Sequence, residues 1–199
     1  QPDYVVHLAA RTDLNGVHLD DYISNTGGVE NILKCCEELP NIRRLILAST
    51  KLIVPTDAQV SDLRSYNPDT IYGESKVLGE KIVESNENFE NWIIVRPTSI
   101  WGPWSLAEHI PYGKFFQIIK KGLYIHPAVV DQPRYFGYVE NSCFQIYALL
   151  VDSSDDVLKG KYYLADYAIY DIKNWADLIS AAFGRGPVRV LPKIFVYVA

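Results

Sequence analysis

The sequence contains no methionine, only three cysteines, and no apolar run near the roughly 20 residues that a membrane-spanning helix requires. Cys35 and Cys36 are adjacent and Cys143 lies far from them, so the cysteines supply neither a disulfide framework nor the spacing of metal ligands. We therefore predict no metal site and no membrane partner. This cysteine usage is typical of a reducing compartment, and we expect a cytoplasmic location.

An excess of positive charge is also absent. The chain has 19 Lys and Arg against 24 Asp and Glu, which gives a net charge of −5. Sequence-independent binding to nucleic acid depends on a basic surface that neutralises phosphates, so we predict no nucleic-acid partner. With 48% hydrophobic and 22% charged residues, the composition suits a globular enzyme domain.

Apolar and polar residues alternate in segments of regular length along the first half of the chain. Strands are predicted at 3–9, 43–49 and 92–96, and helices at 19–39 and 72–87. Pro97 is expected to stop the third strand. Strand, helix, strand, helix, strand at these lengths predicts an α/β fold with a parallel sheet.

The second half has a less regular pattern. Helices are predicted at 111–122, 139–151 and 171–183, with Asp171 as the N-cap of the last, and a strand is predicted at 161–165. Four aromatic residues could line a binding lobe there, although aromatic residues at helical spacing more often form core; they are Tyr112, Phe115, Phe116 and Tyr124.

Tyr72 and Lys76 begin the second predicted helix and are the residues that indicate chemistry most directly. Positions i and i+4 share one face of a helix, so a phenol and an ammonium can point into the same cleft. A neighbouring cation favours the phenolate and lowers the pKa of a tyrosine, which allows general acid or base catalysis. The same spacing also occurs on ordinary amphipathic helices.

Two strands end in small or hydroxyl residues. Ser49 and Thr50 end the strand at 43–49, and Ala9 and Ala10 end the first strand. Open parallel sheets bind ligands outside the carboxyl ends of their strands, so these residues are candidates for a site, although strand-end hydroxyls also cap local backbone. His7 lies inside an apolar run and is interpreted as a packed histidine rather than a ligand or base.

Six stretches resemble, in order, motifs of the extended short-chain dehydrogenase/reductase family, which includes nucleotide-sugar epimerases, dehydratases and reductases. They are His7-Leu-Ala-Ala10, Asn25-Thr-Gly-Gly28-Val-Glu-Asn31, Ala48-Ser-Thr50, Tyr72-Gly-Glu-Ser-Lys76, Arg96-Pro-Thr-Ser-Ile-Trp-Gly-Pro103 and Arg134-Tyr-Phe-Gly-Tyr-Val-Glu-Asn141. The resemblance implies a Rossmann-like doubly wound parallel sheet, with helices on both faces and a small C-terminal substrate lobe.

The resemblance also predicts the domain organisation. Residues 1–103 would form the C-terminal part of the dinucleotide-binding domain, and residues 104–199 mainly the substrate lobe, with segments that return to the core. The first strands and the Gly-rich turn that hold a dinucleotide pyrophosphate in this family have no counterpart in the sequence. Because the chain also begins at Gln1 and contains no methionine, we expect it to be part of a longer protein.

Family resemblance assigns the catalytic roles to Thr50, Tyr72 and Lys76. Tyr72 would take the proton of a secondary hydroxyl while hydride leaves the same carbon for a nicotinamide, and Thr50 would hydrogen-bond the substrate oxygen. Lys76 would hold the nicotinamide ribose and keep Tyr72 acidic. The cofactor, NAD or NADP, would be contacted by Leu8, Ala9, Ala10, Asn25, Ala48, Ser49, Tyr72, Lys76, Pro97 and Thr98.

The implied substrate is a nucleotide sugar, bound by Thr50, Ser99 and Arg134, with selectivity in residues 99–134. Arg134 could hold a diphosphate bidentately, or could be an ordinary surface arginine. Family dehydratases carry an acid pair after this Thr, whereas Lys51 and Leu52 stand here. This difference favours an epimerase or a simple dehydrogenase/reductase.

Other interpretations remain open. The resemblance also extends to hydroxysteroid and flavonoid reductases, which would make the substrate a hydrophobic ketone. A dinucleotide-binding sensor without turnover, or a pure interaction module, would keep the fold without the chemistry. A homodimer through the helix that carries Tyr72 is expected by resemblance, with Leu78, Ile82 and Val83 as its apolar outer face.

Overall fold

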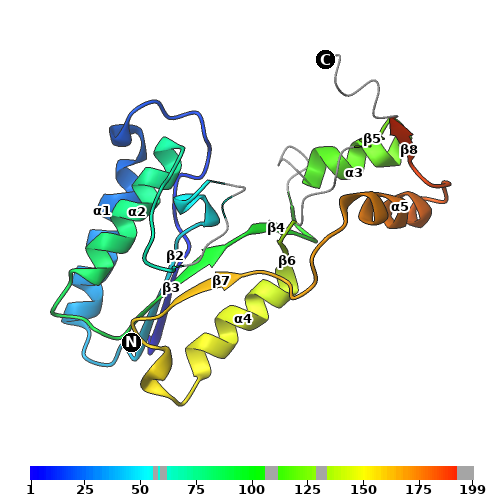
Figure 1. Cartoon of the computed structure of the whole chain (residues 1–199). Coiled ribbons are helices and arrows are strands. Elements are labelled where there is room, and N and C mark those ends of the chain that lie inside the picture. Colours follow the sequence, from blue (N-terminus) through cyan, green and yellow to red (C-terminus); the bar gives the residue numbers. More distant parts are fainter. Residues whose placement is uncertain (56–57, 59–61, 106–111, 129–133, 192–199) are drawn as a thin grey trace. The chain divides into compact units, whose positions relative to one another are not determined.

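A computed structural model describes residues 1–55, 58, 62–105, 112–128 and 134–191 of the chain (Figure 1). The chain forms two compact units, one of residues 1–98 and 141–164 and the other of residues 99–140 and 165–199. Among the described residues, no helix combines the length and the apolar character that crossing a membrane requires.

A parallel sheet forms the centre of the first unit. Its strands lie in the order β1 (Tyr4–His7), β2 (Arg44–Ala48), β3 (Trp92–Pro97) and β7 (Lys161–Leu164). The two central strands are apolar and almost completely enclosed, as expected for parallel strands covered on both faces. The predicted α/β fold is therefore confirmed. The third strand ends at Pro97, as predicted, with this proline as its last residue, in register with Leu164 of β7.

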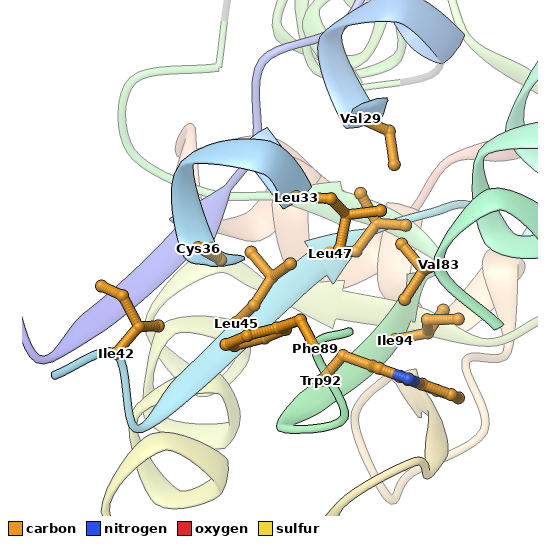
Figure 2. Close-up of a cluster of buried hydrophobic side chains, with 10 residues drawn as sticks. All are labelled: Val29, Leu33, Cys36, Ile42, Leu45, Leu47, Val83, Phe89, Trp92 and Ile94. Carbon is orange, nitrogen blue, oxygen red and sulfur yellow. The ribbon is translucent and has the colours of Figure 1, made fainter. Parts of the chain in front are cut away.

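Helices cover both faces of this sheet. The helix α1 (Ile23–Glu38), which follows the 3-10 turn η1 (Leu19–Tyr22), lies beside α2 (Ile71–Glu84) on one face (Figure 1). Residues of both helices pack with alternate residues of β2 and β3 in one apolar cluster, shown in Figure 2; its members are Val29, Leu33, Cys36, Ile42, Leu45, Leu47, Val83, Phe89, Trp92 and Ile94.

On the opposite face the sheet packs against α4 (Val139–Val151). Ile46 of β2 and Val95 of β3, which alternate with the residues of the first cluster, contact Ile146 and Leu149 of this helix. Arg44 then fixes the end of α4, because its guanidinium donates to the carbonyl of Leu149 at 2.6 Å. A cation at this position also complements the negative end of the helix dipole.

The second unit has its own core. Strand β4 (Ser99–Trp101) pairs with β6 (Phe136–Tyr138), and β5 (Ile125–Pro127) pairs with β8 (Arg189–Leu191). None of these four short parallel strands was predicted. The helices α3 (Tyr112–Lys120) and α5 (Ile172–Ala182) complete the unit around a cluster of Ile119, Phe136, Trp175, Ala176 and Ile179.

Two predictions for this unit can be compared directly with the structure. Asp171 is the N-cap of α5, and its carboxylate accepts the backbone N–H of Asn174 at 2.9 Å. The helix predicted at 111–122 is α3, although its first predicted residue, Pro111, lies outside the described residues.

Candidate active site

The start of α2 is fixed by a capping interaction. Thr70 is the N-cap, and its side chain accepts the backbone N–H of Gly73 at 3.0 Å. This places Tyr72 in the first turn and Lys76 one turn later. Both are buried, with exposed fractions of 8% and 7%, so the pair does not lie on the outer face of an amphipathic helix.

Thr50 follows β2 and lies beside Tyr72. It is the N-cap of the 3-10 turn η2 (Lys51–Ile53), and its hydroxyl accepts the N–H of Leu52 at 3.2 Å. Burial raises the pKa of Tyr72, while a hydrogen bond with the Thr50 side chain acts in the opposite direction. Tyr72 is therefore a neutral phenol near neutral pH. The predicted lowering of the Tyr72 pKa is therefore wrong, because the effect of burial is the larger one.

Lys76 is the buried cation of the site. Removal from water lowers its pKa to about 8, and the charge of Glu80, one turn further along α2, partly opposes this shift. Near neutral pH the side chain is thus an ammonium that has lost most of its hydration. Such a group attracts any anion that forms nearby more strongly than an exposed lysine does.

Asn25 of α1 links the segment after β1 to α2. Its Oδ1 accepts the N–H of Arg11 at 2.8 Å, and its Nδ2 donates to the carbonyl of Arg11 and to Oγ of Ser75, each at 3.0 Å. Ser75 in turn donates to the carbonyl of Tyr72 at 2.7 Å. Asn25 therefore has an internal bridging role, and its predicted contact with a cofactor stays a prediction.

Tyr22 was not predicted as a site residue. It is completely buried, and its ring lies 6.0 Å from that of Tyr72, centroid to centroid. Its hydroxyl donates to the carbonyl of Asp13 at 2.7 Å and accepts the N–H of Gly16 at 3.1 Å. This tyrosine holds the loop after β1 against the ring of Tyr72. Its only signal in the sequence was membership of an apolar helical pattern.

The predicted cofactor-contacting residues that are not on α1 or α2 lie at the carboxyl ends of adjacent strands. After β1, Leu8 is 61% exposed, Ala9 is exposed and Ala10 is half-buried, and Ala48, the last residue of β2, is also half-buried. Ser49 is buried, and its Oγ has no hydrogen-bond partner among the described residues. Pro97, the last residue of β3, is half-buried, and the hydroxyl of Thr98 after it donates to the carbonyl of Leu164 at 2.9 Å.

His7 at the end of β1 is half-buried rather than enclosed in the apolar core. Its Nε2 is buried without a hydrogen-bond partner among the described residues, and a Cβ added to Gly28 of α1 would lie 3.8 Å from it. Burial, and secondarily the charge of Lys76, lower the pKa of His7. His7 is thus a neutral imidazole on the side of the sheet where Lys76 lies.

A buried ion pair that sequence reasoning missed lies next to this site. Arg96, the residue before Pro97 in β3, binds the carboxylate of Glu80 in α2 through both Nε and Nη2, at 3.0 and 2.7 Å. Both side chains are completely buried. A charged residue at the end of the apolar strand Trp92–Pro97 was the available signal for such a pair.

Ser99 and Arg134, predicted to bind substrate, both belong to the second unit. Ser99 is exposed at the start of β4, and the side chain of Arg134 is exposed while its carbonyl accepts the N–H of Tyr170 at 2.9 Å. Their roles stay predictions. Phe115, Phe116 and Tyr124 pack around the core of this unit, so core packing is confirmed for them, and the side chain of Tyr112 lies outside the described residues.

The predicted outer face of α2 needs one correction. Val83 is not on that face, because it is completely buried in the apolar cluster beneath α1 and α2. Ile82 is half-buried and packs against the same cluster, and Leu78 is also half-buried. An apolar contact surface on this helix would therefore centre on Leu78.

Residues 1–165 match the NAD dependent epimerase/dehydratase family. The chain belongs to this family. The resemblance predicted from the six motifs is thus confirmed over most of the sequence. Among curated proteins, no significant match to the chain was found.

Solved structures of related enzymes show the same fold. UDP-glucuronic acid 4-epimerase from Bacillus cereus in complex with NAD is 19% identical, with a TM-score of 0.76 over 95% of this chain and 62% of that one. UDP-N-acetylglucosamine 4-epimerase from the same organism is 22% identical, with a TM-score of 0.75 over 95% and 67%. RMD from Pseudomonas aeruginosa complexed with NADPH is 18% identical, with a TM-score of 0.74 over 96% and 68%. The predicted Rossmann-like fold is confirmed, and the chain spans about two thirds of the length of these structures.

Gly73 allows this epimerase-family chain to bring α2 against the Thr50 turn. A Cβ at this position would lie 2.2 Å from the carbonyl oxygen of Leu52, which cannot move without shifting η2. We expect Gly73→Ala to lower the free energy of unfolding by about 1–3 kcal/mol. Gly27→Ala in α1 is the matched control, because nothing lies within 4 Å of its added Cβ and alanine favours the helix. Equal stabilities of the two variants in urea titrations would contradict the close packing at Gly73.

The lowered pKa of Lys76 also predicts a pH-dependent stability. Below about pH 8 the Lys76 side chain is an ammonium in both the folded and the unfolded chain. Burial of this charge then lowers the free energy of unfolding by its full amount. Between about 8 and 10.5 the folded state loses the proton first, so this destabilisation disappears as pH rises.

The measurement compares the parent protein with Lys76→Met, because the other titrating groups cancel in the difference. We expect the variant to be more stable by about 3 kcal/mol near neutral pH, and the gap to close at high pH. Lys34→Met, which removes an exposed lysine from α1, should give a small difference at both pH values. A gap for Lys76→Met that is constant with pH would contradict the assignment.

Proposed function

We propose that this chain carries the catalytic residues of an NAD(P)-dependent enzyme that oxidises and reduces a secondary hydroxyl or ketone, as an epimerase of a nucleotide sugar. One observation carries the proposal: the phenol of Tyr72 is hydrogen-bonded to Thr50, and the buried ammonium of Lys76 lies one helical turn away. These groups supply a proton carrier, a hydrogen-bond partner and a buried positive charge at one end of a parallel sheet.

The three side chains would divide the proton chemistry between them. Near neutral pH the phenol of Tyr72 donates its proton to the oxygen of a ketone as that carbon is reduced. In the opposite direction the phenolate takes the proton of the alcohol, and the Lys76 ammonium stabilises this anion. Thr50 hydrogen-bonds the same oxygen and keeps it in line with Tyr72.

The residues at the strand ends fit a dinucleotide. Ala9 and Ala10 carry no bulk that would keep a flat ring from the backbone, and Ser49 Oγ is a buried polar atom for which the described residues provide no partner. A nicotinamide held there would accept a hydride from the substrate carbon or return it. The complexes of related structures with NAD and NADPH support either form of the cofactor.

A nucleotide sugar is the proposed substrate class. The related structures include UDP-glucuronic acid and UDP-N-acetylglucosamine 4-epimerases, and Arg134 offers an exposed guanidinium suited to phosphate. Lys51 and Leu52 occupy the 3-10 turn after Thr50, so this turn lacks the acid pair of a dehydratase. Epimerisation or simple oxidoreduction is therefore favoured over elimination of water.

The test uses the full-length protein with NAD or NADP and two substrate panels, one of UDP-sugars and one of hydrophobic ketones. Nicotinamide absorbance reports net oxidation or reduction, and chromatography of the sugars reports epimerisation without net redox change. Turnover of a UDP-sugar is expected. Turnover of the ketones alone would replace the substrate class, and tight cofactor binding without turnover on either panel would favour a sensor.

We also propose a homodimer that forms through α2, with Leu78 at the centre of the interface. A half-buried leucine on a helix that bears the active site is suited to a contact between two copies. Sedimentation equilibrium of the parent and of Leu78→Glu tests this. A dimer that dissociates in the variant is expected, and a monomeric parent would overturn the proposal.

A further inference from the structure

The site residues of α2 belong to a longer stripe along the helix. Tyr72, Lys76, Glu80 and Glu84 follow one another at intervals of four residues and therefore lie on one face. Lys76 and Glu80 are both buried, at 7% and 0% exposure. Buried charges require compensation, so the charged state of each of these two side chains must be stabilised by neighbouring groups.

Arg96 fixes the carboxylate of Glu80 in a single orientation. Its guanidinium donates to Oε1 and Oε2 of Glu80 in a bidentate arrangement, and its Nη1 donates to the carbonyl of Leu63 at 2.9 Å. A planar bidentate pair leaves a carboxylate little rotational freedom. The negative charge of Glu80 is thereby held one turn from Lys76.

Further groups complete the cluster around Glu80. The hydroxyl of Tyr66 lies 2.9 Å from Glu80 Oε2 and 3.1 Å from Glu84 Oε2. Lys161 of β7 donates to this hydroxyl at 2.8 Å and forms an ion pair with Glu84. Tyr163 of β7 lies beside Arg96, with 5.6 Å from the guanidinium carbon to the ring centroid. These contacts join α2, β3, β7 and the loop before α2.

Within the part of the chain that the structure describes, fewer charged and titratable groups surround Lys76. They are His7 from β1, Glu80 from its own helix and Tyr72 one turn before it. His7 is neutral because burial and the lysine charge both disfavour its protonation. Glu80 is therefore the anion among these three groups at neutral pH, and its carboxylate opposes the loss of the Lys76 proton.

We propose that Glu80 is a positioning residue that, held by Arg96, keeps the buried Lys76 protonated one helical turn from Tyr72. Its catalytic meaning rests on the proposed function, because only a reaction that forms a phenolate at Tyr72 requires the ammonium. Without the carboxylate, burial alone acts on Lys76 and favours the neutral amine.

The proposal is tested by measuring the titration of the Lys76 side chain directly. Protein labelled with carbon-13 at lysine Cε is titrated by NMR, and the Lys76 signal is assigned by its loss in Lys76→Arg. In Glu80→Gln, which keeps the shape of the side chain, we expect the Lys76 titration to move to lower pH. Glu84→Gln is the matched control, since it removes a carboxylate from the same stripe one turn further away. An unchanged titration in folded Glu80→Gln would overturn the proposal.

A paired variant keeps the test valid if Glu80→Gln does not fold. Glu80→Met with Arg96→Leu removes both charges of the pair, while Lys161, which lies 4.0 Å from Glu80 Oε2, keeps its ion pair with Glu84. The Lys76 titration should again move to lower pH, and an unchanged titration would again contradict the proposal. In turnover assays the alkaline limb of the kcat profile should move in the same direction. Because the NMR titration requires no substrate, it can succeed even where the proposed reaction is absent.

Discussion

Tyr72→Phe is expected to reduce kcat about 1,000-fold while the affinity for the dinucleotide changes little. The substitution removes one hydroxyl, and with it both the proton carrier and the hydrogen bond to Thr50. The ring remains packed beside Tyr22, so the fold should persist. Steady-state kinetics on the substrate identified by the panels gives kcat, and fluorescence titration gives the cofactor affinity.

Tyr22→Phe is the matched control for this prediction. It keeps the ring contact with Tyr72 but removes the hydrogen bonds to Asp13 and Gly16. We expect a loss of about 1 kcal/mol in stability for each lost bond and a much smaller effect on kcat. If Tyr72→Phe retained kcat within about tenfold of the parent, proton transfer by Tyr72 would be refuted.

The main elements of the first unit were predictable because their determinants are local. The apolar run of β2 ends at Ser49 and Thr50, and α2 begins at its cap Thr70 with Tyr72 and Lys76 on one face. Residues close in sequence thus specify both the strand end and the helix face. The meeting of Thr50 with Tyr72 followed from the family resemblance, because it depends on a turn and a loop that have no periodic pattern.

The short strands of the second unit could not be predicted in the same way. Strands of three residues, such as β4 and β6, are too short to show a period of two, and their partners are more than 30 residues apart in the sequence. Val83 illustrates a second limit. Periodicity placed it on an apolar face, but only the packing of α1 beside α2 shows that this face is the core.

The pair of Glu80 and Arg96 illustrates a third limit. Its residues are 16 positions apart on a helix and the following strand, and nothing in either segment alone specifies their contact. An arginine at the end of an apolar strand signals that some buried partner exists. The partner can be identified only from the packing of α2 on the sheet, which brings the helix face with Tyr72, Lys76 and Glu80 over β3.

Arg96→Leu is expected to lower the free energy of unfolding by about 3–5 kcal/mol. The variant leaves the carboxylate of Glu80 completely buried without its bidentate partner and frees the carbonyl of Leu63. Tyr66 still approaches Oε2 of this carboxylate, and the Lys161 ammonium lies 4.0 Å from the same oxygen, but neither replaces the two hydrogen bonds of the bidentate pair. Urea denaturation followed by circular dichroism measures the loss.

A double variant separates the loss of stability caused by an unpaired charge from the loss caused by missing packing. Glu80→Met combined with Arg96→Leu fills similar volume with apolar atoms and leaves neither charge buried alone, so we expect it to recover most of the stability that Arg96→Leu loses. If the double variant is as unstable as the single one, the pair stabilises the fold through its own contacts. The double variant could instead recover the stability and show a lower pKa of Lys76. An apolar pair would then hold α2 on β3 equally well, and the charged pair would act on the neighbouring site.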